Sequence, residues 1–558
     1  MKKKIIIVGG VAGGASTAAR LRRLDEDAQI ILLEKDGAIS FANCGLPYHI
    51  GGVIERRSAL LLHTPESFHA RFRVDVRVYH EAIQINRQAK TLRIQNKQTG
   101  EFYEESYDKL VLSPGATPIR PPIDGIDAAF TLRNLADTDK ILQYMKQKNP
   151  RSAVVVGGGF IGVEMAESLH RAGLAVTIVE MQNQLVSAVD CDMACAIHQH
   201  VRDQGVQLLL NNAVTAIHRR GETLQLDLTD GSIETEMLIM AVGVKPATDL
   251  ARAADLQLNP RGYIVVNENM QSSDDDIYAL GDAVELTDFV TRTPTTVPLA
   301  GPANKQGRIV ADHICGIPSA YRGAQATAIL RAFDMTVATT GISERTAARL
   351  GIDYDKVITY SPNHATYYPN AQYMTLKVLF ETTTGKILGA QIVGYEGVDK
   401  RCDVLATAIR MGATAHDLTQ LELSYAPPYS SAKDPVNMVG YVIENLLSGR
   451  VKQFHHDAIA TLPRDGSVTL LDTRTPSEYR AGHIDGFVNI PLDELRERLD
   501  ELTPDRPIYL TCAVGQRGYL ACRILTQRGY ECYNLCGGYR FYHSVRAGEK
   551  ESPCCSRD

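Results

Sequence analysis

A single cysteine, Cys44, stands in the run Ser40–Tyr48, which reads SFANCGLPY and follows a glycine-rich turn. No second cysteine follows it within four or five residues. Two neighbouring cysteines can store a pair of electrons as an internal disulfide, whereas a lone thiol forms a persulfide, a sulfenate or a mixed disulfide with a small molecule. The residue types therefore indicate redox chemistry on sulfur, with Cys44 as the reacting group.

A second cysteine, Cys512, opens a short loop, CAVGQR, that ends in Arg517. Such a loop surrounds the sulfur with backbone N–H donors and positive charge, which stabilise a thiolate and the persulfide that it accepts. Together with Leu470–Arg474 (LLDTR) and Glu478–Pro491 (EYRAGHIDGFVNIP), this loop resembles the rhodanese domains over residues 458–547. The resemblance implies that Cys512 carries sulfane sulfur, with Arg517 as a second catalytic residue.

Two segments share the pattern of a dinucleotide site: a buried strand, a glycine turn, a helix, and a second strand with an acidic end. In the first copy Val11 occupies the middle glycine position, so Gly9 and Gly14 carry the pattern with Glu34. The second copy is complete. The candidate cofactor-binding residues are Gly9, Gly10, Ala12, Gly13, Gly14, Glu34 and Lys35 in the first copy, and Gly157, Gly159, Phe160, Ile161, Gly162 and Glu180 in the second.

The acidic end of the second copy bears on the choice of nicotinamide cofactor. A carboxylate at Glu180 accepts ribose hydroxyls and repels a 2′-phosphate, and neither Met181 nor Gln182 supplies a cation for that phosphate. We therefore expect NADH to be preferred, with NADPH as a possible alternative.

Composition excludes several other classes of protein. The 558 residues carry 59 Lys and Arg against 65 Asp and Glu, without a basic stripe, so we expect no nucleic-acid partner. The apolar start, Ile5–Val8, breaks into glycines before it reaches the roughly 7 to 15 residues of a signal peptide. No apolar run has the length of a membrane span. We expect a cytoplasmic protein, in which the 11 cysteines are metal-binding, catalytic or buried rather than structural disulfides.

The pattern of elements divides the chain into domains. Strand-rich stretches close each nucleotide-type segment, and alternating strands and helices begin near Thr327. We expect an α/β protein with two Rossmann-like domains, an α+β domain and a C-terminal α/β domain. The expected boundaries are 1–150 and 266–326 for the two parts of the first nucleotide domain, 151–265 for the second, 327–450 for the α+β domain, 451–457 for a linker, 458–547 for the last domain, and 548–558 for a tail with Cys554 and Cys555.

Over residues 1–450 the chain resembles the pyridine nucleotide-disulfide oxidoreductases, because Ile277–Asp282 (IYALGD) matches a further motif of that family. The resemblance implies FAD at the first glycine turn, NAD(P)H at the second, and Asp282 against the flavin ribitol. It makes 327–450 a dimerisation domain and the protein a homodimer. The further cofactor contacts that it implies are Asn43, Gly115, Gly243, Gly281, Pro298, Leu299 and Ala300.

Within that family, Ser40–Tyr48 and Leu423–Tyr429 (LSYAPPY) are most similar to the coenzyme A-disulfide reductases. The resemblance implies that Tyr425 and Tyr367 come from the partner subunit, where a phenol can protonate a departing thiolate. Arginines suit a ligand with several phosphate charges, although arginines at helical spacing also fit a solvated helix face. The implied coenzyme A contacts are Ser16, Arg20, Arg23, Ser40, Asn43, Arg71, Asn304 and Arg308, whereas Phe72 stands where the family can carry a lysine.

We interpret Cys44 and Cys512 as a relay. NADH would reduce FAD, and the electrons would pass to coenzyme A persulfide at Cys44, while Cys512 would take sulfane sulfur from polysulfide, thiosulfate or another donor. Attack by Cys44 could release either hydrosulfide or coenzyme A, and the sequence leaves both routes open. A depressed pKa of Cys44, from the flavin neighbourhood and a helix that starts after Gly45, would favour the thiolate.

Three alternatives stay open: a coenzyme A-disulfide reductase that maintains thiol pools, a coenzyme A-binding redox sensor, and a flavin peroxidase or oxidase. The resemblance to the family implies that a peroxidase or oxidase would carry a histidine near the first glycine turn, and none lies between Gly9 and Arg23, which disfavours the last alternative. We expect no metal site, since the spacings of the remaining cysteines form no paired CxxC set and fit packed thiols instead. These cysteines are Cys191, Cys195, Cys522, Cys532 and Cys536.

Overall fold

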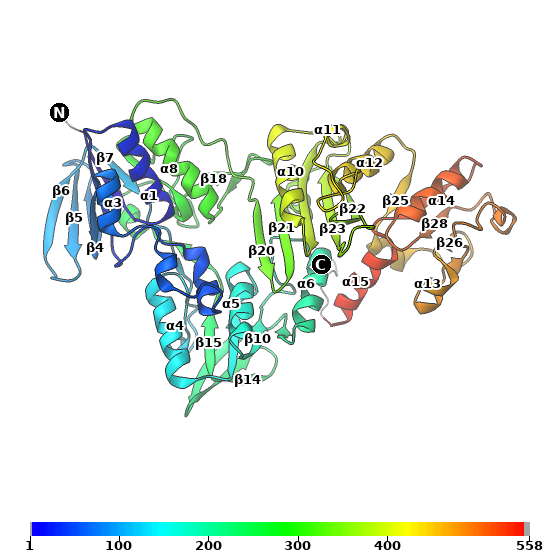
Figure 1. The fold of residues 1–558 in the computed structure, drawn as a ribbon, viewed down its shortest axis with the longest axis horizontal. Coiled ribbons are helices and arrows are strands. Elements are labelled where there is room, and N and C mark those ends of the chain that lie inside the picture. Colours follow the sequence, from blue (N-terminus) through cyan, green and yellow to red (C-terminus); the bar gives the residue numbers. More distant parts are fainter. Residues whose placement is uncertain (1–2, 552–558) are drawn as a thin grey trace. The chain divides into compact units, whose positions relative to one another are not determined.

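The computed structural model describes residues 3–551, so the predicted Cys554 and Cys555 tail lies outside the described residues. The chain forms two compact units (Figure 1). The first unit comprises residues 3–181 and 212–324, and the second comprises 182–211 and 325–551. The predicted nucleotide domain 151–265 is therefore interrupted, because its segment 182–211 belongs to the second unit. No helix within residues 3–551 combines the length and the apolar character that crossing a membrane requires.

The first unit contains a five-stranded parallel sheet in the order β17-β7-β1-β2-β3. Strands β1 and β2 are continuous apolar runs, as expected for strands that are covered on both faces. Helices α1 and α8 pack against each other beside this sheet (Figure 1). The elements are β1 (Lys4–Val8), α1 (Ala12–Leu24), β2 (Gln29–Glu34), β3 (Asp75–Val78), β7 (Lys109–Leu112), β17 (Ile277–Ala279) and α8 (Ala300–Ile314).

A second parallel arrangement in this unit has β9 between β10 and β15. Helix α5 packs on β9 and β10, and the short helix α2 packs on α5. The elements of this part are α2 (Leu46–Ile50), α4 (Leu135–Lys148), β9 (Ser152–Val156), α5 (Phe160–Arg171), β10 (Ala175–Val179), β12 (Val214–Arg220), β13 (Thr223–Leu228), β14 (Ser232–Thr235) and β15 (Met237–Met240).

A separate antiparallel sheet of the first unit consists of β4 (His80–Asn86), β5 (Thr91–Asn96) and β6 (Phe102–Ser106). The remaining short elements are η1 (Asn43–Gly45), η2 (Arg57–Leu60), α3 (Pro65–Phe72), β8 (Ala116–Pro118), η3 (Ile126–Ala128), β16 (Val244–Pro246), α7 (Asp249–Ala253), η4 (Gly281–Ala283), β18 (Leu286–Thr287) and β19 (Pro294–Thr295).

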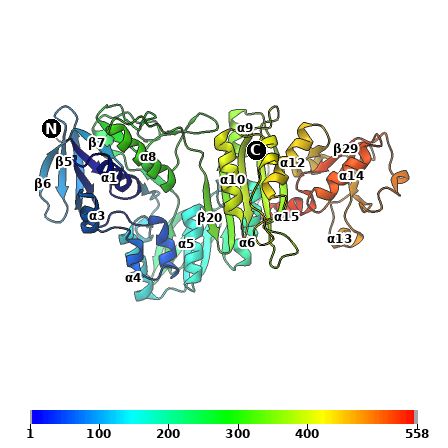
Figure 2. The ribbon, with the colours of Figure 1, turned by 45° about the horizontal axis from the view of Figure 1, so that its top comes forward.

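The second unit begins with an antiparallel sheet in the order β20-β21-β24-β23-β22. Helix α10 packs on β21 and β24, α6 on β24, and α12 on β22 (Figure 2). The elements are α6 (Cys191–Asp203), β11 (Gln207–Leu209), β20 (Ala328–Ala332), β21 (Met335–Gly341), α9 (Glu344–Leu350), β22 (Asp355–Pro362), β23 (Tyr373–Phe380), β24 (Ile387–Gly394), α10 (Val398–Met411), α11 (Ala415–Gln420) and α12 (Pro435–Leu447).

The same unit ends in a five-stranded sheet in the order β25-β29-β28-β26-β27, whose paired strands are all parallel. Two apolar clusters, one around Leu510 and one around Leu535, form its core. Helix α15 continues to Glu551, so the domain boundary expected at residue 547 falls inside a helix. The elements are β25 (Lys452–Phe454), η5 (His456–Thr461), β26 (Thr469–Asp472), α13 (Pro476–Ala481), β27 (Val488–Asn489), η6 (Leu499–Glu501), β28 (Ile508–Thr511), α14 (Gln516–Thr526), β29 (Cys532–Leu535) and α15 (Gly538–Glu551). This architecture confirms the predicted α/β class.

Candidate active site

The two glycine turns have the same construction. Gly9 has φ +99° and Gly157 has φ +107°, a backbone region that favours glycine. A Cβ atom on Gly14 would collide with the carbonyl oxygen of Gly9, and one on Gly162 with that of Gly157. Each turn therefore brings a helix start against the end of a strand, as a dinucleotide site requires, even though Val11 interrupts the first motif.

The acidic strand ends close both turns. The Gly10 N–H donates to Glu34 Oε2 at 2.8 Å, and the Gly158 N–H donates to Glu180 Oε2 at 2.6 Å. Burial raises the pKa of Glu34, against the effect of backbone N–H donors from Gly10 and Asp36. Both carboxylates are thus held at the position where the motif places ribose hydroxyls.

A cavity of about 880 Å³ lies in the first unit beside the first turn. Its volume falls within the range of ligand pockets. Its lining includes Gly9, Glu34, Lys35, Asn43 and Gly115, all of them predicted cofactor contacts.

Two polar side chains that the sequence analysis missed lie near the predicted FAD motif. Arg133 lines the cavity and donates from Nη2 to Asp282 Oδ2 at 2.8 Å. Gln306 on α8 accepts from the Gly281 N–H at 2.8 Å, while its buried Nε2 has no hydrogen-bond partner among the described residues. A buried donor without a partner is costly, so Nε2 is available to an acceptor on a bound group. Helix α8 begins at Ala300, directly after Pro298 and Leu299. The residues present therefore fit a dinucleotide.

Cys44 lies in the 3-10 helix η1, directly before α2. It is the exposed cysteine among those in residues 3–551, and its Sγ lies 3.9 Å from Asn43 Oδ1. Desolvation and then the Glu164 carboxylate raise the pKa of Cys44, while Arg133 acts in the opposite direction. The protein's own groups therefore do not lower the pKa of Cys44, and the predicted effect of a bound flavin on it stays a prediction.

Glu164 connects the cysteine segment to the second glycine turn. It lies on α5, the helix that starts at this turn, and accepts a hydrogen bond from the Tyr48 hydroxyl at 3.1 Å. Burial, together with the nearby Glu167 charge, raises the pKa of Glu164. The helix of the second nucleotide motif thus packs beside the cysteine segment. No motif near Cys44 in the sequence predicts this contact.

Four predicted coenzyme A contacts meet where α1 packs on α8. The Ser16 hydroxyl bonds to Asn304, and Arg20 binds Asp312 at 2.7 Å with Arg308 3.8 Å from the same carboxylate. Asp312 therefore offsets the charge of Arg20. The other predicted contacts are separate: Arg23 and Arg71 are exposed, and Ser40, at φ +44°, donates its N–H to the Gly10 carbonyl.

Tyr367 and Tyr425 lie in the second unit and face solvent, with 74% and 47% of their surfaces exposed. Their hydroxyl oxygens are 3.0 Å apart. Hydrogen bonding to Tyr425 raises the pKa of Tyr367. The fold therefore brings these two predicted acid groups together at one point of the surface.

The Cys512 loop places one backbone N–H donor at the sulfur. Cys512 is fully buried and its Sγ accepts from the Gly515 N–H at 3.1 Å. The start of α15 braces the loop, because the Tyr539 N–H donates to the Cys512 carbonyl at 2.8 Å and the Arg540 N–H to the Ala513 carbonyl at 2.9 Å. One backbone donor thus binds the sulfur, and two others hold the loop that carries it.

The side chain of Arg517 forms an ion pair with Glu478. It binds both carboxylate oxygens of Glu478, at 2.6 and 2.8 Å. Glu478 also accepts from the Thr475 N–H, and the hydrogen bonds from Arg517 contribute most to lowering its pKa to about 2. The sequence missed this ion pair, which offsets the charge that Arg517 brings to the loop.

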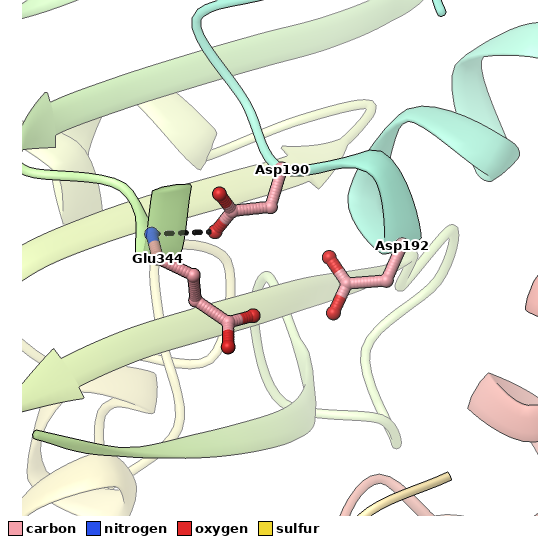
Figure 3. Close-up of side chains that lie close together, drawn as sticks. All are labelled: Asp190, Asp192 and Glu344. Carbon is pink, nitrogen blue, oxygen red and sulfur yellow. Dashed lines mark hydrogen bonds between the residues drawn. The ribbon is translucent and has the colours of Figure 1, made fainter. Parts of the chain in front are cut away.

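Three carboxylates cluster where α6 meets the antiparallel sheet, namely Asp190, Asp192 and Glu344 (Figure 3). The fully buried Lys377 ammonium lies among them, 3.0 Å from Asp190 and 2.7 Å from Asp192, and it also contacts Glu344. Although burial opposes the charge, these carboxylates raise the pKa of Lys377. A lysine therefore supplies the positive charge at this cluster.

The remaining cysteines of the C-terminal sheet are buried, as expected: Cys522, Cys532 and Cys536 are 0%, 5% and 7% exposed. Cys195 on α6 is also buried, whereas the expectation of a packed free thiol is wrong for Cys191, which is disulfide-bonded.

Comparisons with known proteins agree with this division of the chain. Residues 3–307 match the family described as pyridine nucleotide-disulphide oxidoreductase, and residues 327–435 match its dimerisation domain. Residues 455–544 match the rhodanese-like domain.

Similar proteins cover most of the chain. The coenzyme A disulfide reductase of Staphylococcus epidermidis is 40% identical over 440 residues, which cover 78% of this chain and 99% of the relative. The structure of reduced CoADR-RHD from Bacillus anthracis is 50% identical, with a TM-score of 0.96 and 99% of both chains covered.

Two further structures are more distant. A NAD-dependent persulfide reductase from A. fulgidus is 36% identical, with a TM-score of 0.89 and coverage of 96% of this chain and 99% of that one. A water-forming NADH oxidase from Lactobacillus brevis is 26% identical, with a TM-score of 0.77 and coverage of 80% and 100%.

Proposed function

Because the chain belongs to the pyridine nucleotide-disulphide oxidoreductase family, we propose that it is a flavin-dependent NAD(P)H oxidoreductase that reduces coenzyme A persulfide or disulfide at Cys44. The observation that carries the proposal is the position of Cys44. Its lone, exposed thiol lies next to Asn43 in the cavity wall and directly before α2, which packs on the helix of the second nucleotide turn. A thiol in this position can react with a small sulfur compound from one side and receive electrons from the other.

The family's cofactors match the two glycine turns. Bound FAD would pass electrons from NAD(P)H to the sulfur species at Cys44. Glu34 and Glu180 would accept ribose hydroxyls, and the carboxylate of Glu180 favours NADH because it repels a 2′-phosphate. Arg133 holds the Asp282 carboxylate, which would bind the ribitol, and the Gln306 Nε2, which has no partner in the part of the chain that the structure describes, would donate to the bound group.

Coenzyme A would bind over α1 and α8. Ser16 and Asn304 supply polar groups there, and Arg308 supplies a cation. Since Arg20 is held by Asp312, the exposed Arg23 and Arg71 are better placed to meet phosphates. Asn43, which precedes the thiol, would contact the pantetheine end of the ligand.

The reaction at Cys44 can be written in two balanced forms. Attack of the thiolate on the inner sulfur of coenzyme A persulfide forms a Cys44–coenzyme A disulfide and releases hydrosulfide. Attack on the outer sulfur forms a Cys44 persulfide and releases the coenzyme A thiolate. Either product needs two electrons to restore the thiol. The leaving thiolate takes a proton, which the hydroxyls of Tyr367 and Tyr425 would supply from the partner subunit of a homodimer.

The C-terminal domain would supply the sulfur. Cys512 accepts sulfane sulfur from polysulfide, thiosulfate or another donor and passes it to the coenzyme A thiol, whose pantetheine arm would travel between the sites. A rhodanese-like domain is expected for a persulfide reductase, whereas reduction of a plain disulfide needs no sulfur transfer. Eight described cysteines are free thiols and one, Cys191, is disulfide-bonded; because free thiols predominate, we place the protein in the cytoplasm.

A second function, maintenance of thiol pools by reduction of coenzyme A disulfide, is favoured by the similarity to the staphylococcal reductase. Steady-state NADH oxidation by the purified protein, with coenzyme A persulfide, coenzyme A disulfide or hydrogen peroxide, distinguishes the functions. We expect the highest kcat/KM with the persulfide and no turnover of either coenzyme A substrate by the Cys44→Ser variant. Faster turnover with the disulfide would favour the second function, and faster turnover with peroxide would favour a peroxidase.

A further inference from the structure

Arg401 on α10 is a buried charged residue to which the proposed reaction gives no role. It is 1% exposed, and its Nη2 lies 3.0 Å from the carboxylate of Asp434, which is also buried. Its Nη1 donates to the Gly397 carbonyl at 3.3 Å. Arginine is almost never buried this completely unless it is paired, so the contacts of this guanidinium indicate what it does.

This guanidinium joins two loops that are far apart in the chain. Its Nη2 donates to the Asn363 carbonyl and to the Ser430 hydroxyl, each at 3.0 Å. Asn363 opens the loop after β22, which carries Tyr367, and Ser430 belongs to the loop before α12, which carries Tyr425. The Ser430 hydroxyl in turn donates to Asp434 at 2.7 Å. One buried group therefore binds both loops.

The two loops also meet through their backbones, close to the guanidinium. The Ala365 N–H lies 3.1 Å from the Ser430 carbonyl oxygen and 3.3 Å from the Pro427 carbonyl oxygen. Lys400, the residue before Arg401 on α10, donates from Nζ to the Ser424 carbonyl at 3.3 Å. Two successive cations of one helix thus bind the segments on either side of this backbone contact.

The positions of the two phenols depend on these loops. Tyr367 and Tyr425 are both exposed, so neighbouring side chains cover little of either ring. An exposed side chain is located mainly by the backbone that carries it. Their hydroxyl oxygens are 3.0 Å apart, and a further separation of roughly 0.5 Å would end the hydrogen bond. The pair therefore requires that the two loops keep a fixed distance.

We propose that Arg401 is a positioning residue for the proton-donating pair, because its guanidinium holds the two loops at the separation at which the Tyr367 and Tyr425 hydroxyls share a hydrogen bond. The inference rests on the proposed role of these tyrosines in reduction at Cys44. The planar fork of an arginine binds several acceptors at fixed angles, which the compact ammonium of a lysine does not reproduce. Arg401→Lys therefore keeps the charge beside Asp434 and loosens the loops.

The test measures turnover of coenzyme A disulfide by the full-length protein with bound FAD. In Arg401→Lys we expect kcat to fall by about tenfold or more, the effect of a catalytic group displaced by a distant change. The KM for NADH and the rate of flavin reduction by NADH should stay unchanged. Ser430→Ala removes one contact of the guanidinium without changing a charge, and it should lower kcat in the same direction but by less.

The decisive comparison repeats each substitution in a protein that already carries Tyr367→Phe and Tyr425→Phe. If Arg401 acts through the phenols, Arg401→Lys should cause no further loss of kcat in that background. A loss by the same factor in both backgrounds would assign Arg401 a merely structural role and overturn the inference. An unchanged kcat in Arg401→Lys alone would also overturn it. Should Arg401→Lys fail to fold, Ser430→Ala decides by the same two criteria.

The matched control is Arg474→Lys, since Arg474 is also buried and pairs with a buried carboxylate, that of Asp472, at 2.7 Å. It lies in the C-terminal domain and should keep kcat with coenzyme A disulfide; an equal fall in this control would overturn the inference. Full activity of the double phenylalanine variant would refute the proposed role of the tyrosines and the inference with it. A wild type that does not turn over coenzyme A disulfide or persulfide would contradict the proposed function as a whole.

Discussion

The hydroxyl oxygens of Tyr367 and Tyr425 lie 3.0 Å apart, although 58 positions separate the two residues in the chain. One comes from the loop after β22 and the other from the loop before α12. Both rings are exposed, so the two hydroxyl groups lie together on the surface of the dimerisation domain. Two phenols that share a hydrogen bond act on a proton as a unit.

Replacing either tyrosine by phenylalanine should therefore lower kcat by about a hundredfold, the size of a lost general acid. The double variant should be little worse than either single variant, because the groups act together. Steady-state kinetics with coenzyme A disulfide measure all three. Tyr429→Phe, an exposed tyrosine of the same loop, is the control and should keep full activity. Additive losses would show that the pair does not function as one.

Burial and then the Glu164 carboxylate raise the pKa of Cys44, so Glu164→Gln, which removes the second cause, should lower this pKa. Thiolate then forms at lower pH, and the acid limb of the pH profile should shift towards acid. The rate of alkylation of Cys44 against pH measures the shift directly. Glu55→Gln removes an exposed carboxylate from the same segment and should leave the profile in place. A shift towards alkaline pH in Glu164→Gln would contradict this account of the site.

Glu180 is expected to select NADH. Glu180→Ala loses the acceptor for ribose hydroxyls, so kcat/KM for NADH should fall by about tenfold, the value of a hydrogen bond to a charged group. The value for NADPH should fall less or rise, because the repulsion of the 2′-phosphate is removed. Glu222→Ala, an exposed carboxylate paired with Lys148, is the control. An equal loss with both cofactors would assign Glu180 a purely structural role.

The ion pair between Arg517 and Glu478 should slow the transfer of sulfur from anionic donors to Cys512. Glu478→Gln frees the guanidinium to attract thiosulfate, so loading of Cys512 should become roughly threefold faster, the scale of a surface ion pair. Cyanolysis of the loaded protein measures the rate. Glu494→Gln breaks the comparable pair with Arg498 and should have no effect. Slower loading in Glu478→Gln would mean that the pair orders the loop for catalysis.

Local chemistry made much of this molecule predictable. Gly9 and Gly157 need positive φ, and the turn that they form depends on residues within one strand-helix unit. The Cys512 loop is similar, because six consecutive residues contain both the sulfur and the Gly515 N–H that binds it. Where a site is built from neighbours in the chain, spacing is sufficient to find it.

Contacts between residues that lie far apart in the chain could not be predicted from the sequence. Tyr48 and Glu164 are 116 positions apart, and Glu478 and Arg517 are 39 apart, so neither pair has a local signature. The rise in the pKa of Cys44 comes from burial and then from the Glu164 carboxylate, and neither the burial nor that distant carboxylate has a signature near Cys44 in the sequence. The same holds for residues 182–211, whose Asp190 and Asp192 bind Lys377 of the second unit.

We propose that Cys512 delivers the sulfur that is reduced at Cys44. The most direct test compares NADH oxidation by the wild type and Cys512→Ser with two substrates: polysulfide plus coenzyme A, after subtraction of the uncatalysed rate, and pre-formed coenzyme A persulfide. We expect at least a tenfold loss in Cys512→Ser with polysulfide plus coenzyme A and an unchanged rate with the persulfide. An equal loss with both substrates, or no loss with either, would contradict it.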